Sequence, residues 1–437
     1  MNAETLSKYF LFAYFFIIFL PEHYAHAKEE EEKTPISFEE INEAFNIQLF
    51  SDDCLWDDED MATAKRMKLP RESKTSTQAS FRHYPSAKTI VLGIRPYSLA
   101  MYSRDGKPTY ISAIFINKGD YAPYLKIKNN KSMNELEKYK LTHKAFSEFK
   151  KILKKEGDII RQNMTDLLGE SKRTTFGQGH GMKDRVYRWD WNDHAFLLAI
   201  TRDEYISLKI MSTEQANANG KALHKTTDSE LRAKLKQAVQ RLPNGDVFVS
   251  DIPMVSQGPK GYCVPATWER YLRYMDIPAD MYSLAMAGGS GKGGGTSFES
   301  LIEATNQLVS RHGRRIRSFK SNISISSISR YIDDGLALMW CMYVVPQLNK
   351  QISQRSKKRP QTPDMSKWIE TIKPYRKEAR EISKDTGHGH VCMIIGYNKE
   401  TKEIAISDSW GANFEKRWIT TEEAEAIDHG NFLIITW

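Results

Sequence analysis

The sequence predicts an α+β protein with two folded domains and mainly antiparallel sheets. Its 437 residues exceed one ordinary core, since domains usually contain ~100–200 residues. Short segments rich in β-branched and aromatic residues, separated by turn signals, occur on both sides of a polar stretch at residues 213–229, with helical patterns between them. Apolar residues make up 40% and charged residues 27%, which excludes a wholly disordered, collagen-like or multi-span membrane protein.

Residues 1–27 are predicted to be a secretory signal peptide. Twelve apolar residues run from Tyr9 to Leu20, and a small-x-small pattern ends at Ala27. Twelve residues of helix span ~18 Å, less than the ~30 Å hydrocarbon core of a membrane, so cleavage near Ala27 is favoured over an uncleaved membrane anchor. We therefore expect a bacterial-type exported protein, periplasmic or extracellular, without a stable membrane span.

Three regions follow the predicted signal peptide. Residues 28–85 are predicted to be an irregular leader with one short helix, which Ser37 and Glu40 cap. Residues 86–212 are predicted to be an N-terminal α+β domain, with one helix among strands at TIVLGI, LAMYS, TYISAIFI, YLKIK, VYRWDW, AFLLAI and YISLKI. The sequence of this domain shows no nucleophile, metal cluster or phosphate loop, so its role is left open. Residues 213–245 are predicted to be a linker followed by a helix.

The C-terminal domain, residues 246–437, contains one cysteine in a position suited to chemistry. Cys263 lies at the start of a predicted helix whose first turn includes Pro265. Unpaired N–H groups and the helix macrodipole favour a thiolate at such a position. The amide of Gln257, six residues earlier, could donate to an oxyanion together with the Cys263 backbone N–H. A cysteine at a helix start without partners is more often a buried core residue, so the assignment depends on the rest of the domain.

A histidine and an aspartate in the second half of this domain supply those partners. His390 begins an apolar strand, and a turn near Glu400 returns the chain along a second strand to Asp408. This hairpin places Asp408 across from His390, where it could orient the ring while the other ring nitrogen faces Cys263. Cys, His and Asp with a preceding Gln meet the requirement for acyl transfer through a thiolate.

These residues resemble the active-site residues of the papain-like cysteine peptidases. The resemblance covers about residues 247–437 and is carried by the run from Gln257 to Cys263, by His390 six residues before Gly396-Tyr397, and by Asp408-Ser409-Trp410-Gly411. With Gly295-Thr296-Ser297 opening a later helix, the pattern is most similar to the C39-like branch, cysteine peptidase family thirty-nine.

The resemblance implies a fold, an activity and roles for four residues. It implies a papain-like α+β fold in which an N-terminal helix bearing the cysteine packs on an antiparallel sheet. Cys263 would be the nucleophile, and His390 would be the general base and acid. Asp408 would orient His390, and Gln257 would donate to the oxyanion. Lys260 stands where papain-type enzymes often carry a second cysteine, so their structural disulfide is not expected.

The expected function is that of an exported cysteine peptidase that hydrolyses peptide bonds, with a peptide or protein substrate as its partner. Two alternatives stay open, namely an amidase or acyltransferase that acts on cell-wall peptides, and a catalytically silent peptide-binding module. The formal net charge is only +8 and no basic stretch is interleaved with aromatic residues, so no nucleic-acid partner is expected. The sequence does not determine the oligomeric state or the cleavage specificity.

Two nearby patterns suggest other ligands. His388, His390 and Cys392 alternate and could share one face of a strand, but no fourth metal ligand accompanies them. Residues 287–296 (AGGSGKGGGT) lack the Ser or Thr that a phosphate loop requires directly after Lys, and they are expected to lead into a helix capped by Thr296. We therefore predict no metal and no cofactor.

Two further features are left open. Cys341 and Cys392 could form a disulfide in an exported protein. Residues 347–385 form a polar, basic insertion directly before the histidine strand. This insertion is expected to be solvated and partly helical, with a lid over the substrate cleft as the alternative.

Overall fold

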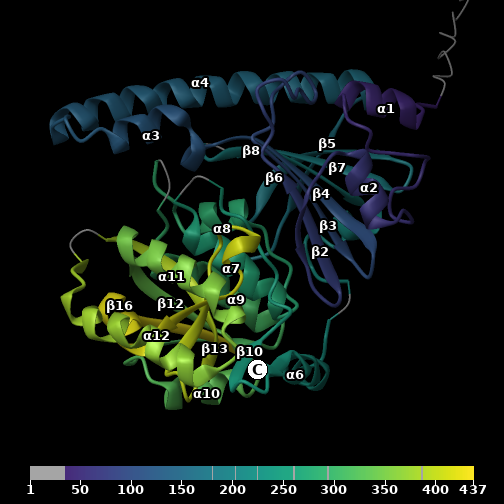
Figure 1. The fold of residues 1–437 in the computed structure, drawn as a ribbon. Helices are drawn as coiled ribbons and strands as arrows, with labels where there is room; N and C mark the ends of the chain where they lie inside the picture. The colour runs from purple at the N-terminus through teal and green to yellow at the C-terminus, as the bar shows by residue number, and fades with distance from the viewer. Residues whose placement is uncertain are drawn as a thin grey trace, which may run out of the picture. The chain divides into compact units, whose positions relative to one another are not determined.

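The computed structural model describes residues 35–437, apart from residues 180, 202, 224, 259–260, 293–294 and 385–386. The predicted signal peptide and Lys260 lie outside the described residues. Residues Ile36–Trp437 form one compact unit that contains two sheets with accompanying helices (Figure 1). Every strand pair among the described residues is antiparallel, so the predicted α+β class with antiparallel sheets is confirmed.

The first sheet has eight strands, and we call this sheet with its helices, residues 36–217, the N-terminal lobe. Two meanders meet at the centre of the sheet, where Tyr110 lies opposite Met211. The strand order is β1 (Arg71–Lys74), β2 (Gln78–His83), β3 (Ser98–Arg104), β4 (Lys107–Asn117), β8 (Tyr205–Ser212), β7 (His194–Thr201), β6 (Asp184–Trp191) and β5 (Lys172–Phe176).

The long helix α4 (Glu135–Leu168) packs on the first sheet through an apolar stripe (Figure 1). Phe149, Ile160 and Met164 of this stripe are buried in the same core as Phe196 of β7, because residues at these spacings share one helix face. The other helices of the lobe are α1 (Phe38–Phe45), α2 (Asp60–Arg66), α3 (Ala122–Asn129) and α5 (Thr213–Asn217). Helix α1 begins at the predicted capping box of Ser37 and Glu40.

The segment that the sequence predicts to be an irregular leader, residues 28–85, contributes α2, β1 and β2 to the N-terminal lobe. The two strands escape sequence analysis because they bury polar side chains. Ser80 and Arg82 of β2 donate to Glu72 of β1, at 3.0 and 2.7 Å, and all three side chains are largely buried. The alternation of apolar and polar residues that indicates a half-buried strand is therefore missing.

Two predicted strands of the N-terminal lobe take other conformations. The segment YLKIK belongs to helix α3, where Pro123 occupies the first turn and needs no hydrogen-bond donor. The segment TIVLGI forms only an isolated bridge between Val91 and Ile94, around a turn in which Leu92 and Gly93 both have positive φ. A short apolar run by itself does not distinguish these outcomes from a strand.

The second sheet with its helices, residues 228–437, forms the C-terminal lobe. Its longest strand, β13 (His388–Asn398), pairs with three neighbours. The strand order is β11 (Arg315–Lys320), β16 (Asp428–Thr436), β12 (Leu338–Val344), β13, β10 (Asp246–Val249) and β9 (Val239–Arg241), while β14 (Glu403–Ser407) pairs with β13 and β15 (Arg417–Thr420) pairs with β14.

Eight α-helices of the C-terminal lobe lie within its described residues. They are α6 (Asp228–Gln237), α7 (Cys263–Tyr274), α8 (Met281–Ala287), α9 (Phe298–Arg311), α10 (Ile325–Ile332), α11 (Pro346–Lys358), α12 (Met365–Glu378) and α13 (Thr421–Ile427). The helix predicted between residues 229 and 242 is thus shorter than expected, because Val239 pairs with Val249 in strand β9.

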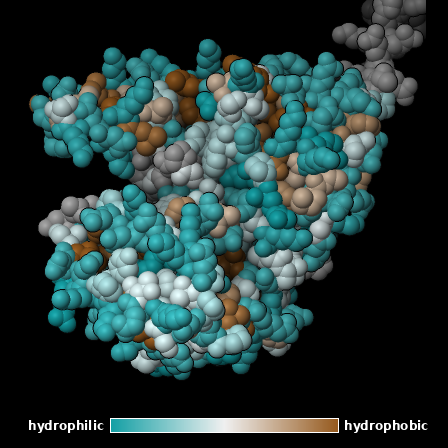
Figure 2. Space-filling model, viewed as in Figure 1, coloured by the Kyte–Doolittle hydropathy of each residue, from teal (hydrophilic) through white to brown (hydrophobic). Residues whose placement is uncertain are grey.

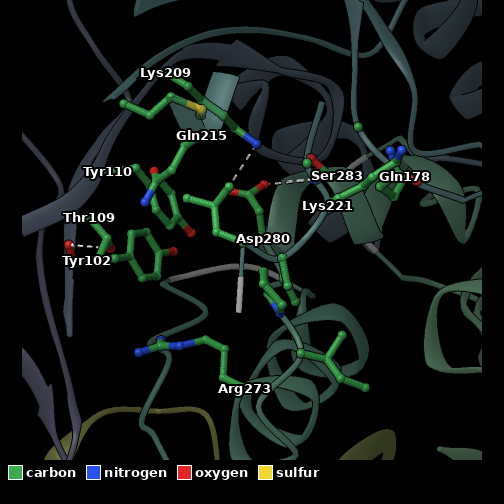
Figure 3. Close-up of a pocket in the computed structure, with 18 of the residues that line it drawn as sticks. Tyr102, Thr109, Tyr110, Gln178, Lys209, Gln215, Lys221, Arg273, Asp280 and Ser283 are labelled. Carbon is green, nitrogen blue, oxygen red and sulfur yellow. Dashed lines mark hydrogen bonds and ion pairs between the residues drawn. The ribbon is translucent and has the colours of Figure 1, made fainter. Parts of the chain in front are cut away.

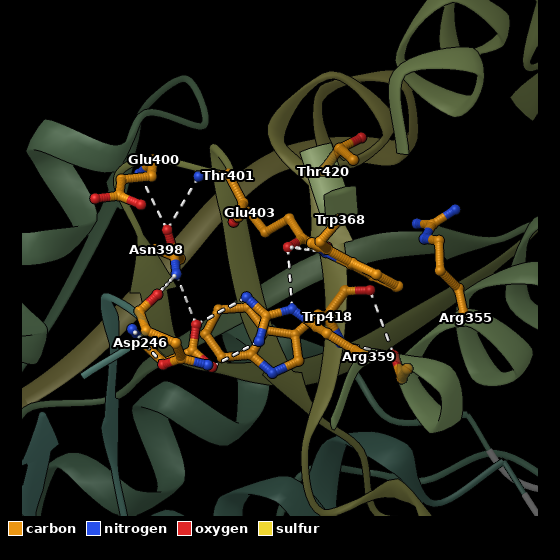
Figure 4. A network of polar contacts seen from close by, with 12 residues as sticks. Asp246, Arg355, Arg359, Trp368, Asn398, Glu400, Thr401, Glu403, Trp418 and Thr420 are labelled. Atoms are coloured by element: carbon orange, nitrogen blue, oxygen red, sulfur yellow. Dashed lines mark hydrogen bonds and ion pairs between the residues drawn. The ribbon is translucent and has the colours of Figure 1, made fainter. Parts of the chain in front are cut away.

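The described part of the insertion, residues 347–384, is a packed part of the C-terminal lobe, which corrects the expectation of a solvated excursion (Figure 4). Arg359 donates to both carboxylate oxygens of Asp246, at 2.6 and 2.7 Å, and to Glu403 at 3.1 Å. Trp368 Nε1 donates to the same Glu403 at 2.9 Å. These side chains are buried, so a lid made of this segment would have to break buried ion pairs to open.

In the part of the chain that the structure describes, no helix has both the length and the apolar character needed to span a membrane.

Candidate active site

Cys263 is the first residue of α7, and its side chain is half-buried. Trp268 and Tyr271 of the same helix are fully buried in the core of the C-terminal lobe, which fixes the helix against the sheet. Thr267 Oγ1 donates to the carbonyl of Val391 on β13 at 3.1 Å and so ties the first turns of α7 to the residue after His390. The cysteine therefore lies at a helix start, as the sequence predicts.

His390 lies on β13 with its ring buried, and its Nε2 atom is 2.9 Å from Asp408 Oδ1. Cys263 interacts with the same ring and raises its pKa. Because Nε2 bonds to Asp408, Nδ1 is the ring nitrogen that can face the thiol. The hairpin of β13 and β14 explains the placement of the acid, because Met393 lies opposite Ser407 and Asp408 follows directly. The structure thus brings the predicted cysteine, histidine and aspartate together.

Asp408 is fully buried and has a cationic partner that the sequence analysis missed. Arg417 on β15 donates from Nη2 to Asp408 Oδ2 at 2.6 Å. Its Nη1 donates to Asn349 Oδ1 at 2.7 Å and to Ser353 Oγ at 2.8 Å, and both acceptors belong to α11. Arg417 therefore holds the carboxylate behind His390 and connects α11 to the site.

Trp410 covers one face of His390. The two ring centroids are 4.5 Å apart and the ring planes are inclined by 25°. The guanidinium of Arg417 lies 5.4 Å from the same tryptophan ring. This aromatic cover keeps the pair of His390 and Asp408 away from bulk water, which strengthens their electrostatic interaction.

The contacts among these residues shift their ionisation. Burial raises the pKa of the Cys263 thiol, but the hydrogen bond and charge of His390 and nearby backbone N–H groups outweigh it, so the pKa is lowered. Burial lowers the pKa of His390, but Asp408 and Cys263 raise it to about 9. Burial raises the pKa of Asp408, but Arg417 and His390 hold it below its ordinary value. The site therefore favours a thiolate and an imidazolium beside an ionised carboxylate.

Gln257 is buried, and Ser409 orients its side chain. The Gln257 backbone N–H donates to the Ser409 carbonyl at 2.8 Å, and the Ser409 hydroxyl donates to Gln257 Oε1 at 2.7 Å. Because Oε1 accepts this bond, the amide NH2 is the donating end of the side chain. An open groove adjoins the amide, and its described lining residues are Gln257, Gly258, Val344, Pro346, Asn349, His388 and Trp410.

A larger pocket of about 600 Å³ is lined by residues of both lobes (Figure 3). Tyr102, Tyr110 and Lys209 come from the first sheet, and Arg273 and Asp280 come from the end of α7 and the start of α8. The lining residues described for this pocket include neither cysteine nor histidine. The smaller groove is lined by Gln257 and by Trp410, which stacks on His390, so of the two cavities it is the one beside the candidate site.

The glycine-rich residues 287–296 border the segment that precedes Cys263. The N–H of Gly295 donates to the carbonyl of Gly261 at 3.0 Å. The run leads into α9, whose N-cap is Ser297 rather than the predicted Thr296, because the Ser297 side chain accepts from the N–H of Ser300.

The remaining cysteines do not join the site. All four cysteines lie within the described residues and are free thiols. Cys341 lies opposite Val391 and Cys392 lies opposite Trp340, so the two thiols point to opposite faces of the sheet and a disulfide between them is not formed. Among the described residues, no three His, Cys, Asp or Glu side chains are grouped so that they could hold a metal ion.

Comparison with known proteins finds a family model that is similar to part of the chain. Residues 249–428 match the family model described as the Peptidase_C39 like family. The matched part includes Gln257, Cys263, His390 and Asp408, and the match confirms the similarity to the C39-like branch. No match was found among the curated proteins.

Proposed function

We propose that this protein is an exported cysteine peptidase that hydrolyses peptide bonds, a proposal that the match of residues 249–428 to the Peptidase_C39 like family supports. The observation that carries the proposal is the arrangement of Cys263, His390 and Asp408. The half-buried Cys263 has its pKa lowered by His390, and the buried His390 bonds to the buried Asp408 at 2.9 Å. Such a series supplies a nucleophile, a base that activates it and an acid that orients the base. Export is proposed from residues 1–27, whose pattern is that of a cleaved signal peptide.

The proposed reaction begins with the Cys263 sulfur and the carbonyl carbon of the scissile bond. The sulfur–carbon bond forms as the carbonyl π electrons move to the oxygen, and the oxyanion accepts from the Gln257 amide and the Cys263 backbone N–H. His390 gives its proton to the leaving nitrogen as the carbon–nitrogen bond breaks, which leaves a thioester. A water molecule that transfers a proton to His390 then adds to the thioester and releases the acid and the thiol.

Two further residues support this proposal. Arg417 keeps Asp408 ionised, so that Asp408 can stabilise the imidazolium form of His390. Trp410 stacks on the imidazole and limits its rotation. A module that only binds peptides has no use for a buried ion pair of this kind behind a histidine, because such a pair costs desolvation energy.

We extend the proposal to the architecture. The C-terminal lobe is a papain-like fold in which α7 carries the nucleophile and packs on the strand that carries His390. The contact between Thr267 and Val391 and the burial of Trp268 in the shared core support this arrangement.

Labelling by a peptide with a thiol-directed electrophile tests the proposed nucleophile. We expect the wild-type protein to be labelled and Cys263→Ala to lose the label. Cys54→Ala is the matched control, since Cys54 is also a partly exposed free thiol but its side chain bonds to Asp57 of the N-terminal lobe. Equal labelling of wild type and Cys263→Ala contradicts the proposal.

Turnover distinguishes a peptidase from its alternatives. Mass spectrometry of a peptide library incubated with wild type should show hydrolysed peptides, which Cys263→Ala does not produce. Labelling without any turnover indicates a binding module. Products that carry a transferred acyl group, or loss of ammonia from cell-wall peptides, indicate the acyltransferase or amidase alternative.

A further inference from the structure

The segment from Met254 to Tyr262 carries Gln257 and leads directly to Cys263, and residues of the N-terminal lobe hold it near both of its ends. Its position decides where the oxyanion donor lies relative to the thiol. The C-terminal lobe holds it as well, through the bonds between Gln257 and Ser409. The contacts from the N-terminal lobe are as numerous, and they come from residues far away in the sequence.

The first end of the segment is bound to strand β1 and to Tyr84, the residue that follows β2. Ser73 Oγ accepts from the N–H of Met254, and Glu72 Oε1 accepts from the N–H of Ser256, both at 2.8 Å. The Tyr84 hydroxyl donates to the carbonyl of Ser256 at 2.6 Å. The backbone N–H and carbonyl of Ser256, the residue before Gln257, therefore both bond to the N-terminal lobe.

Tyr84 also packs against the residue that follows Gln257. Gly258 has φ of +69°, and a Cβ atom at this position would lie 3.1 Å from the Tyr84 ring. The tyrosine thus touches the residues on both sides of the oxyanion donor, by a hydrogen bond on one side and by packing on the other.

The second end of the segment is bound by the turn after β4. The Tyr262 hydroxyl donates to Asn117 Oδ1 at 2.9 Å. The Tyr262 ring lies so close to Gly119 that a Cβ atom there would overlap the hydroxyl. Tyr262 also packs in a small core with Ile114 of β4, and Tyr262 is the N-cap residue of α7, next to Cys263.

These anchors are themselves rigid. Glu72 accepts from Arg82 at 2.7 Å and from Ser80 at 3.0 Å, and the ion pair is almost completely buried. Asn117 sits at the end of β4, and its side chain caps the next turn by accepting from the N–H of Asp120 at 3.0 Å. A buried, hydrogen-bonded anchor transmits its position to the segment that it holds.

We propose that the N-terminal lobe is a working part of the active site, and that Glu72, Tyr84 and Asn117 are positioning residues that hold the Gln257 amide and the Cys263 thiol in register. The inference rests on the proposed function. It gives the N-terminal lobe a role that differs from a removable inhibitor, because removal of the lobe would leave both ends of the segment without these partners. Preorganisation of an oxyanion donor is worth more than its hydrogen bonds alone, since misplacement by ~1 Å costs up to ~100-fold in rate.

The test removes single oxygen atoms from the anchors. Tyr84→Phe and Tyr262→Phe keep the rings and delete only the hydroxyls that donate to Ser256 and Asn117. In a background of Cys54→Ser and Cys341→Ser, the rate of Cys263 alkylation by iodoacetamide is measured against pH, together with kcat and KM for a cleaved peptide. Each variant should slow alkylation at neutral pH by about two- to tenfold and lower kcat by at least as much, with KM nearly unchanged.

The matched control is Tyr205→Phe in the same sheet. Tyr205 is buried, like Tyr262, and its hydroxyl donates to the half-buried Asp184 at 2.5 Å rather than to the segment. This control should lower the melting temperature and leave the alkylation profile and kcat unchanged. Glu72→Gln is the conservative rescue, because its amide oxygen can still accept from Ser256, and it should retain more activity than Glu72→Ala.

The outcomes separate this proposal from the proposed function. An activated thiol in wild type with the same alkylation profile and kcat in both tyrosine variants overturns the positioning role and leaves the peptidase intact. The positioning role is also overturned if Tyr205→Phe lowers the alkylation rate and kcat as much as the two test variants do. The loss would then come from reduced stability. A wild-type Cys263 that titrates as an ordinary thiol and supports no turnover removes the proposed function itself.

Discussion

His390 contacts Asp408 on one side and Cys263 on the other, and both contacts favour its protonated form. Its pKa is therefore raised to about 9, while the pKa of the Cys263 thiol is lowered. At pH values above the lowered pKa of Cys263 and below the pKa of His390, the thiolate and the imidazolium coexist. Below this range the thiol is protonated and cannot attack, and above it His390 has no proton for the leaving nitrogen.

We expect kcat/KM for a peptide substrate to rise with pH as Cys263 ionises and to fall again near pH 9 as His390 loses its proton. In Asp408→Asn the neutral amide stabilises the imidazolium less, so the alkaline limb should move to lower pH by about one unit or more, and kcat should fall. A pH series of initial rates for both proteins measures these shifts. If kcat/KM of wild type still rises above pH 10, His390 is not the proton donor.

At the scale of residues, the sequence predicts four side chains of the candidate site, because only a few residue types can serve as nucleophile, base, orienting acid or oxyanion donor. Gln257, Cys263, His390 and Asp408 stand in local patterns that place them at a helix start and along a hairpin. Arg417 is not predictable in the same way, because an arginine in a short strand usually faces solvent. Arg417 can be buried because it donates to Asn349 and Ser353, and both residues belong to α11, more than 60 residues earlier in the chain.

At the scale of elements, α11 and α12 are held on the second sheet by buried charges. Arg359, directly after α11, contacts Asp246 of β10 and Glu403 of β14. Arg355 of α11 pairs with Glu423 of α13 at 2.6 Å. Because Arg417 also bonds to α11, these contacts help to fix the helix that borders the candidate site.

Arg359→Met should strongly destabilise the protein, because it leaves the carboxylates of Asp246 and Glu403 buried without their cation. Removing one partner of a buried ion pair typically costs about 3–5 kcal/mol. Urea unfolding followed by circular dichroism measures the change in free energy. Lys358→Met is the control, since Lys358 is the exposed neighbour of Arg359, and it should change stability by less than about 0.5 kcal/mol. Similar losses in both variants contradict the role of the network.

Elements with apolar patterns are the ones that the sequence predicts. Strands β4, β7 and β8 and helix α7 bury apolar residues at the expected spacings. Strands β1 and β2 instead bury the side chains of Glu72, Ser80 and Arg82, and polar side chains are usually exposed. The hydrogen-bond partners of these three side chains lie in the other lobe or on the neighbouring strand. No local sequence pattern therefore reveals the two strands.

At the scale of the whole compact unit, the two lobes share buried polar contacts. Arg82 bonds to Glu72 and, at 2.7 Å, to the Tyr102 hydroxyl, which donates to Glu269 of α7 at 3.1 Å. Glu269 is fully buried, and it also accepts from the N–H of Met281 at 2.8 Å. The sequence predicts two domains with a linker between them, but it cannot predict this contact, because the four charged or polar residues are ordinary in their local surroundings.

The shared contacts predict that residues 36–437 unfold in one cooperative transition. If one lobe unfolded alone, it would leave Glu269, Ser256 and Tyr262 of the other lobe without buried partners, and each such loss costs about 1–3 kcal/mol. Differential scanning calorimetry should therefore give a single peak whose calorimetric enthalpy equals the van't Hoff enthalpy. Hydrogen exchange in rising urea should show peptides of β7 and of β13 losing protection at the same midpoint. Two peaks, or midpoints that differ between the two strands, would show that the lobes fold independently.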